Sequence, residues 1–312
     1  MTNRNPKRRP PSGYRAPAAT EAPAPRRGLL DGLFAPKGSG PATMPGILTS
    51  FSRGFVLMIS TPVLLVGVPV VLLLEWLVLL AFGFQGPFTL LGAVFAMAPM
   101  GTLADLALGG SVAGTGSPIA GLAGVFGFLV FRAVLLGLIA TVSVERLRTG
   151  AVSSWSLRRV PRVLPVTIGV NLLSLSVLIV GNVISTLLGP GIGLLIYFAA
   201  LVGTLYLTAY AATVAADEDR RLPDTMRRAM RVARTPGAGN LTLAALYAIP
   251  AYALLVAPLP GSLIGVNPSP LAWAISIVIN LLSVAMGATF AFRYLSVAAE
   301  IPDVAPASRR RR

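Results

Sequence analysis

The chain has 312 residues, a formal net charge of +15, and neither cysteine nor histidine. The absence of both residue types excludes disulfide frameworks, thiol nucleophiles, imidazole acid–base catalysis and most zinc chemistry. Apolar residues make up 54% of the chain and charged residues only 12%. Because the apolar residues come in blocks close to the roughly 20 residues that cross a bilayer, the composition is typical of a polytopic membrane protein.

The two ends of the chain are basic and rich in proline and alanine. Residues 1–45 show almost no periodicity, which predicts a disordered cytoplasmic tail, and residues 300–312 form a second basic tail. The stretch "GLLDGLF" is too short for a signal sequence and contains Asp31. Lysine occurs only at Lys7 and Lys37 beside abundant arginine, alanine, glycine and proline, which suggests a GC-rich bacterial source.

The transmembrane domain is predicted over residues 46–299. Six apolar segments are long enough to span a bilayer: 54–82, 118–144, 164–188, 192–216, 241–259 and 271–297. If residues 83–117, which include Asp105, stay outside as a re-entrant or surface segment, every lysine and arginine beyond the apolar segments falls on the cytoplasmic side. The prediction is an all-α, six-span bundle in the bacterial cytoplasmic membrane, with both termini cytoplasmic.

Two basic octamers, "SLRRVPRV" (156–163) and "TMRRAMRV" (225–232), occupy equivalent cytoplasmic connections. Residues 222–234 have helical spacing of apolar positions, with Pro223 and Asp224 suited to a first turn, so an amphipathic elbow helix is predicted. In residues 153–164, Ser153 or Ser154 can cap a helix and Pro161 interrupts it, which predicts a short elbow rather than a long helix.

The arginines of both elbows are expected to contact anionic lipid headgroups. They are Arg158, Arg159, Arg162, Arg227, Arg228, Arg231 and Arg234. The alternative interpretation is that they serve only as topology anchors. The apolar stripes of the elbows would lie either in the acyl chains or against the bundle.

The connection "VAADEDRRLPDTMRRAMRVAR" (214–234), with a weaker copy in "VERLRTGAVSSWSLRRVPRVLP" (144–165), resembles the membrane domain associated with bacterial glycerophosphoryl diester phosphodiesterases. The resemblance extends over residues 46–299. The sequence departs from that pattern in having Asp217, Glu218, Asp219 and Met230 where the family often has a Glu-Gly lead-in and a tryptophan. The catalytic domain of such fusions is absent here, so the resemblance implies no activity.

Arg132 lies midway along the segment 118–144. A charge within a membrane span is costly, so Arg132 is a candidate functional residue. Glu75 is its best candidate partner, and Asp105 is the alternative. The three residues form either a buried ion pair that fixes packing or part of an interior cavity.

Other polar residues in the spans are expected to hold helices together rather than to bind ligand: Asn171, Ser174, Asn280 and Ser283. Tyr294 with Arg293 lies near a predicted inner end, and this pair is interpreted as an interfacial anchor.

The sequence contains neither a nucleophile elbow nor a Walker A loop, and it predicts no enzyme, cofactor, metal or nucleic-acid partner. The predicted function is a membrane scaffold or accessory factor in lipid or envelope homeostasis, which contacts membrane lipids and has another membrane protein or a second copy as a candidate partner. The alternative is a small secondary transporter or lipid translocator with a cavity around Arg132 and Glu75.

Overall fold

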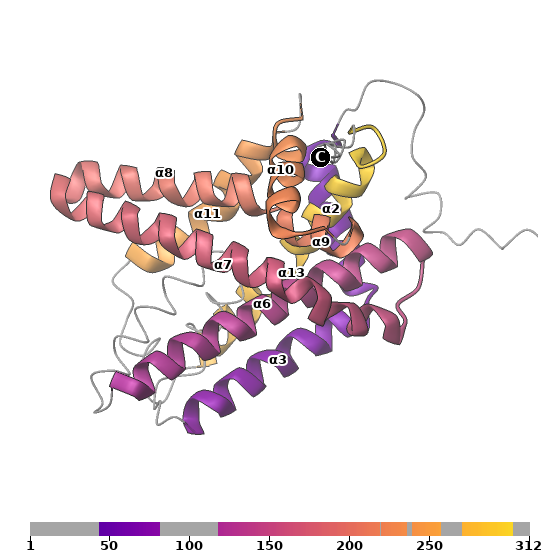
Figure 1. Cartoon of the computed structure of the whole chain (residues 1–312), viewed down its shortest axis with the longest axis horizontal. Helices are drawn as coiled ribbons and strands as arrows, with labels where there is room; N and C mark the ends of the chain where they lie inside the picture. The colour runs from indigo at the N-terminus through magenta and orange to yellow at the C-terminus, as the bar shows by residue number, and fades with distance from the viewer. Residues whose placement is uncertain (1–43, 82–117, 219, 236–238, 257–269, 302–312) are drawn as a thin grey trace, which may run out of the picture. The chain divides into compact units, whose positions relative to one another are not determined.

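A computed structural model describes residues 44–81, 118–218, 220–235, 239–256 and 270–301, and all regular secondary structure in these ranges is α-helical. Figure 1 shows the arrangement of the helices. They are α2 (Ile47–Ile59), α3 (Pro62–Ala81), α6 (Pro118–Thr149), α7 (Ser154–Leu188), α8 (Pro190–Thr208), α9 (Ala211–Glu218), α10 (Leu222–Ala233), α11 (Asn240–Val256) and α13 (Pro270–Val297). The predicted outer segment 83–117 and most of both tails lie outside the described residues.

The first predicted span, 54–82, is wrong as a single helix. Helix α2 ends at Ile59, α3 begins at Pro62, and the two are bent by 78°. A residue before proline is disfavoured in the α conformation, whereas proline is well suited to the first turn of a new helix. The Thr61 carbonyl accepts the Leu64 backbone N–H at 2.9 Å, so this break starts the next helix directly.

The prediction of a separate first elbow is also wrong. Helix α7 runs without interruption from Ser154 to Leu188, with Pro161 and Pro165 inside it. Each proline removes a backbone donor and costs about 3 kcal/mol in a helix interior. The helix persists because its other face is buried, with Val163 and Val166 in the core, and each such side chain contributes roughly 1.5–3 kcal/mol.

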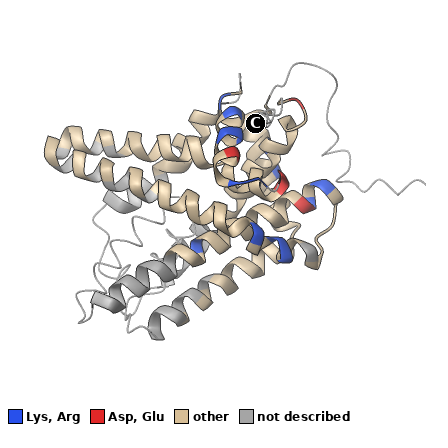
Figure 2. Cartoon of the chain, in the orientation of Figure 1, with Lys and Arg blue, Asp and Glu red and all other residues tan. Residues whose placement is uncertain are grey.

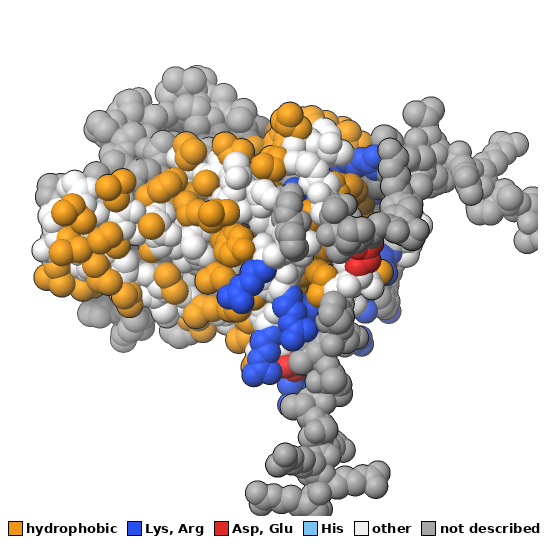
Figure 3. Space-filling model, turned by 90° about the horizontal axis from the view of Figure 1, so that it is seen from above, with side chains coloured by type: hydrophobic (Ala, Val, Ile, Leu, Met, Phe, Trp, Pro, Cys, Tyr) orange, Lys and Arg blue, Asp and Glu red, His pale blue; other side chains and the backbone are white. Residues whose placement is uncertain are grey.

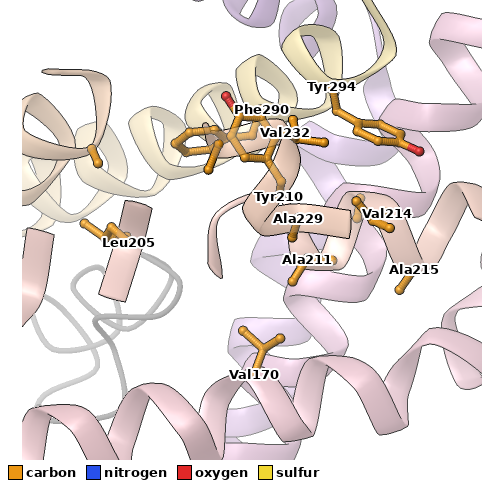
Figure 4. Close-up of a cluster of buried hydrophobic side chains, with 14 of the residues drawn as sticks. Val170, Leu205, Tyr210, Ala211, Val214, Ala215, Ala229, Val232, Phe290 and Tyr294 are labelled. Atoms are coloured by element: carbon orange, nitrogen blue, oxygen red, sulfur yellow. The ribbon is translucent and has the colours of Figure 1, made fainter. Parts of the chain in front are cut away.

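The second predicted elbow coincides with α10. Pro223 lies in its first turn, and Asp224 is placed where an acidic side chain favours the helix dipole. Its inward face includes Met226, Ala229 and Val232, which join the core formed with α8, α9 and α13 (Figure 4). The apolar stripe of α10 therefore packs against the bundle rather than projecting into acyl chains.

Helices α2 and α13 approach each other closely at Gly54. A Cβ atom there would lie 2.7 Å from both the Ala285 carbonyl oxygen and the Thr289 backbone nitrogen, and closer still to Thr289 Oγ1. The contact of α7 with α8 follows from a tight connection in which Gly189 has a φ of +81°, a conformation that glycine adopts readily. Figure 1 shows α7 and α8 side by side.

The described residues contain fewer candidate membrane spans than the six predicted. One stretch, Gly191–Glu218, is by itself long and apolar enough to cross a membrane. A second candidate is counted if the bent pair Ile47–Ile59 and Pro62–Val71 forms one span. The described apolar helices Asn240–Ile249 and Leu281–Val297 are shorter than a span. The predicted segments 241–259 and 271–297 extend beyond those two stretches.

Candidate functional site

A polar network lies where the end of α13 meets the chain segment before α2, and Arg293 is its centre. The Arg293 side chain is fully buried. Its Nη1 donates to the Pro45 carbonyl at 2.8 Å and to Ser50 Oγ at 3.0 Å, and its Nη2 donates to Asn240 Oδ1 at 3.0 Å. These neutral acceptors replace the water that a guanidinium loses on burial, a loss that is otherwise very costly.

Two residues extend this first node to neighbouring elements. Asn240, at the start of α11, donates from Nδ2 to the Ala233 carbonyl at 2.9 Å, which attaches it to the end of α10. Tyr210, just before α9, donates its hydroxyl hydrogen to Asn240 Oδ1, and its ring packs edge-on against Phe290 at 5.3 Å. Arg293 thus joins α2, α9, α10, α11 and α13 at one point.

Asp217 and Glu218, at the C-terminal end of α9, form a second node. Arg148, at the end of α6, donates from Nε and Nη2 to the two carboxylate oxygens of Asp217 at 2.5 and 2.6 Å. The Tyr294 hydroxyl contacts Asp217 Oδ2 at 3.2 Å and Glu218 Oε1. Carboxylates at a helix C-terminus are unfavourable for the helix dipole, so these partners offset a local electrostatic cost.

Arg228 completes the second node from α10. Its Nε donates to Glu218 Oε1 at 3.0 Å, while Nη1 and Nη2 donate to the carbonyls of Ile301 and Ala298 at 2.5 and 2.9 Å. Arg220 Nε also lies within ion-pair distance of Glu218 Oε2, although that oxygen has no partner in hydrogen-bonding geometry. The chain just after α13 is therefore held by α10.

The hydrogen bond that Arg148 donates to Asp217 raises the pKa of Arg148 above its already high ordinary value, and burial of the guanidinium opposes this only in part. Arg148 therefore stays cationic over the whole pH range in which proteins are studied. Because its side chain is 54% exposed, solvent screens the pair, and its contribution to stability is small.

The predicted headgroup arginines divide into three groups. Arg228 is only 3% exposed and bonded inside the protein, which corrects its assignment as a headgroup contact. Arg159 is partly buried and donates to the Ala216 carbonyl at 2.8 Å. The other five are exposed: Arg158, Arg162, Arg227, Arg231 and Arg234.

Arg293 and Tyr294 were expected to be interfacial anchors, and the structure corrects this as well. Both side chains are fully buried; α2 and the segment before it contact Arg293, and the end of α9 contacts Tyr294. Their hydrogen-bond partners lie in three separate stretches of the sequence: residues 45–50, 210–218 and 240. No spacing rule links those partners, so the nodes were missed in the sequence.

Arg132 is buried in α6, with 3% of its surface exposed. The Glu75 side chain and Asp105 lie outside the described residues, so the proposed grouping of these three stays a prediction. A cavity of about 50 Å³ lies further along α6, beginning at Leu136 and reaching Tyr247 and Ser283. It has room for a few water molecules but is far smaller than the roughly 300 Å³ or more of a small-molecule site.

The four polar span residues behave differently from one another. Asn171 Nδ2 donates to the Leu129 carbonyl of α6 at 3.5 Å, a contact between helices of the kind expected. Ser174 Oγ instead donates to the Val170 carbonyl within its own helix at 2.7 Å. Ser283 is hydrogen-bonded to Tyr247, which links α13 to α11, and the Asn280 side chain lies outside the described residues.

The network holds helix ends together. The carboxylates of Asp217 and Glu218 are engaged by arginines and by Tyr294. Within the described part of the chain, no group of three or more acidic residues could hold a metal ion.

Comparison with known proteins gives no match: no protein-family model, no curated protein and no solved structure is similar to this chain. The resemblance of residues 214–234 to a phosphodiesterase-associated membrane domain therefore stays a prediction. Inference about function depends on the geometry of the chain itself.

Proposed function

We propose that the chain is an integral membrane protein whose helices form a polytopic bundle. The observation that carries this proposal is the exposure of large apolar side chains along α3, α7, α8 and α11. Leu187 of α7 is 79% exposed, Leu195 of α8 is 71% exposed and Val66 of α3 is 63% exposed. Apolar exposure on this scale marks an interaction surface, and acyl chains would cover it without any further protein partner.

The distribution of charge along the chain supports the same membrane location. Residues 164–216 contain no charged side chain, although they include most of α7, all of α8 and most of α9. Charged side chains of the described residues gather around α10, the end of α9 and the adjoining ends of α6 and α7 (Figure 2). In the space-filling view, blue side chains lie near the middle and toward the right, whereas the left end, where α7 and α8 lie, shows orange and white side chains without blue ones (Figure 3).

We further propose that all six apolar segments cross the bilayer, with the charged end at the cytoplasmic face. Pro45, Arg148, Asp217 and Ile301 belong to the four parts of the chain that the positive-inside rule assigns to the cytoplasm. Hydrogen bonds of the two nodes gather these same parts at the helix ends. This agreement supports a cytoplasmic location for both termini.

The role that fits this architecture best is a non-enzymatic scaffold or accessory factor in membrane lipid or envelope homeostasis. The buried charged side chains near the helix ends hold neighbouring helices together. The described cavity is too small for a solute. Its proposed partners are lipids with anionic headgroups, together with another membrane protein or a second copy.

A pair of single-cysteine variants tests the topology, because the natural chain contains no cysteine. Ala151→Cys lies just before α7 and Gly191→Cys lies just after it; both positions are exposed. In intact bacterial cells, a membrane-impermeant maleimide should label Gly191→Cys at once and Ala151→Cys only after permeabilisation. Labelling of both variants from the same side would show that α7 does not span the membrane.

A further inference from the structure

The first turns of α7 present arginines and apolar residues together on one exposed face. The exposed positions are Leu157, Arg158, Pro161, Arg162 and Pro165, and Leu157 is 49% exposed. Positions spaced by three, four and seven or eight residues share one face of a helix. This face is therefore both cationic and apolar.

The rotation of these turns about the helix axis is fixed by the opposite face. Ser156, Val163 and Thr167 are buried, and Arg159 donates to the Ala216 carbonyl of α9 at 2.8 Å. Because these contacts hold the inner side of the helix, Arg158 and Arg162 point away from the bundle.

The same helix continues as a surface for acyl chains. From Pro165 to Leu187 it carries no charge and extends for about 33 Å at 1.5 Å per residue, close to the roughly 30 Å of a hydrocarbon core. Helix α10 crosses this face where Leu222 lies against Gly169, and exposed leucines and valines follow beyond it. Arg162 and Arg158 consequently lie one and two turns outside the apolar stretch, at headgroup level.

Helix α10 differs, although its sequence is similar. Its exposed side chains include Asp224, which lies 3.7 Å from the guanidinium of Arg227 and reduces the positive charge of that face. Large hydrophobic side chains are not among the exposed residues of α10. Apart from Pro223 in the first turn, the exposed face of α10 therefore presents polar and charged side chains rather than apolar surface for a lipid tail.

We propose that Arg158 and Arg162 bind the phosphate of an anionic glycerophospholipid whose acyl chains lie along the exposed apolar residues of α7. A guanidinium can donate two parallel hydrogen bonds to one phosphate group. Two arginine side chains one helical turn apart can therefore bind one headgroup and the headgroup next to it. Pro161 and Pro165, which lie closer to the apolar stretch, contact the glycerol and upper acyl region. This inference rests on the proposed membrane location.

The test compares two variants that each lose two positive charges. Full-length Arg158→Gln/Arg162→Gln and the control Arg227→Gln/Arg231→Gln are purified in an uncharged detergent and titrated with phosphatidylglycerol or phosphatidylcholine, and bound lipid is counted by native mass spectrometry. We expect roughly tenfold weaker binding of phosphatidylglycerol by the α7 variant, little change in the control, and no difference between variants for phosphatidylcholine.

Three results would overturn the proposal: unchanged phosphatidylglycerol binding by the α7 variant, an equal loss in both variants, or displacement of the lipid by millimolar inorganic phosphate. The last result would indicate a site for a free anion. The labelling of Ala151→Cys and Gly191→Cys separates the two levels of inference, because a failed headgroup site leaves that pattern intact, whereas same-side labelling overturns the membrane topology itself.

Discussion

Replacing Gly54 by alanine tests the close approach of α2 to α13. The added Cβ would lie 2.7 Å from two backbone atoms of α13, the Ala285 carbonyl oxygen and the Thr289 nitrogen. Ordinary contacts at such atoms are several tenths of an ångström longer, so α2 and α13 must separate, and the neighbouring side chains lose their packing. Overpacking of this kind costs about 1–3 kcal/mol, and the better helix propensity of alanine returns about 1 kcal/mol.

We therefore expect Gly54→Ala to lower the free energy of unfolding by up to about 2 kcal/mol. The matched control is Gly203→Ala in α8, where a Cβ would meet nothing within 4 Å. This control should be neutral or stabilise the protein by up to about 1 kcal/mol through helix propensity. Unfolding of both variants in detergent micelles, followed by far-ultraviolet circular dichroism against denaturant, gives the comparison.

A second substitution separates backbone from side-chain crowding. Thr289→Ala removes the nearest atom, Oγ1, but leaves both backbone contacts, so the double variant Gly54→Ala/Thr289→Ala should remain less stable than Thr289→Ala alone. Equal stability of Gly54→Ala and the natural chain would refute the close approach of α2 and α13.

Three further substitutions test the polar nodes. Arg293→Gln should lower the free energy of unfolding by about 3 kcal/mol, at about 1 kcal/mol for each of its bonds to Pro45, Ser50 and Asn240. The control, exposed Arg234→Gln, should change it by less than about 0.5 kcal/mol. Equal effects of the two substitutions in denaturant titrations would contradict the Arg293 node. Tyr294→Phe should lower the free energy of unfolding by about 1–2 kcal/mol, because it removes the hydroxyl contacts to Asp217 and Glu218. Tyr206→Phe is the control. No loss of thermal stability in Tyr294→Phe relative to that control would count against the second node. Arg148→Gln should lower the free energy of unfolding by about 1 kcal/mol, and 1 M salt should reduce this difference, since the Arg148 side chain is 54% exposed although that of Asp217 is only 6% exposed. A large, salt-independent loss would show that solvent does not screen the pair.

Several elements could be predicted because the responsible signal is local. The amphipathic period of residues 222–234 predicts α10, and the glycines around Gly189 predict the turn between α7 and α8. A local proline signal misled at α7, where burial of the opposite helix face outweighs the cost of Pro161. At Pro62 the same residue type does end one helix and begin the next.

The two nodes could not be predicted, since their residues are far apart in the sequence. Arg293 and Arg228 each look like an ordinary arginine beside an apolar run, and nothing in the local pattern distinguishes them from exposed Arg227 or Arg158. Only the packing of α2 over Arg293, and of α10 beside Glu218, reveals which of these charges are interior.

The central claim is that the exposed apolar face of α7 contacts lipid. Spin labels at Val180→Cys, which replaces a 57% exposed side chain, and at exposed Ala151→Cys test it in reconstituted bilayers. Collision with oxygen, which concentrates in hydrocarbon, should be high at Val180→Cys while collision with a water-soluble nickel complex is low, and Ala151→Cys should show the reverse. High accessibility of the Val180→Cys label to the nickel complex would place this face in water and contradict the account.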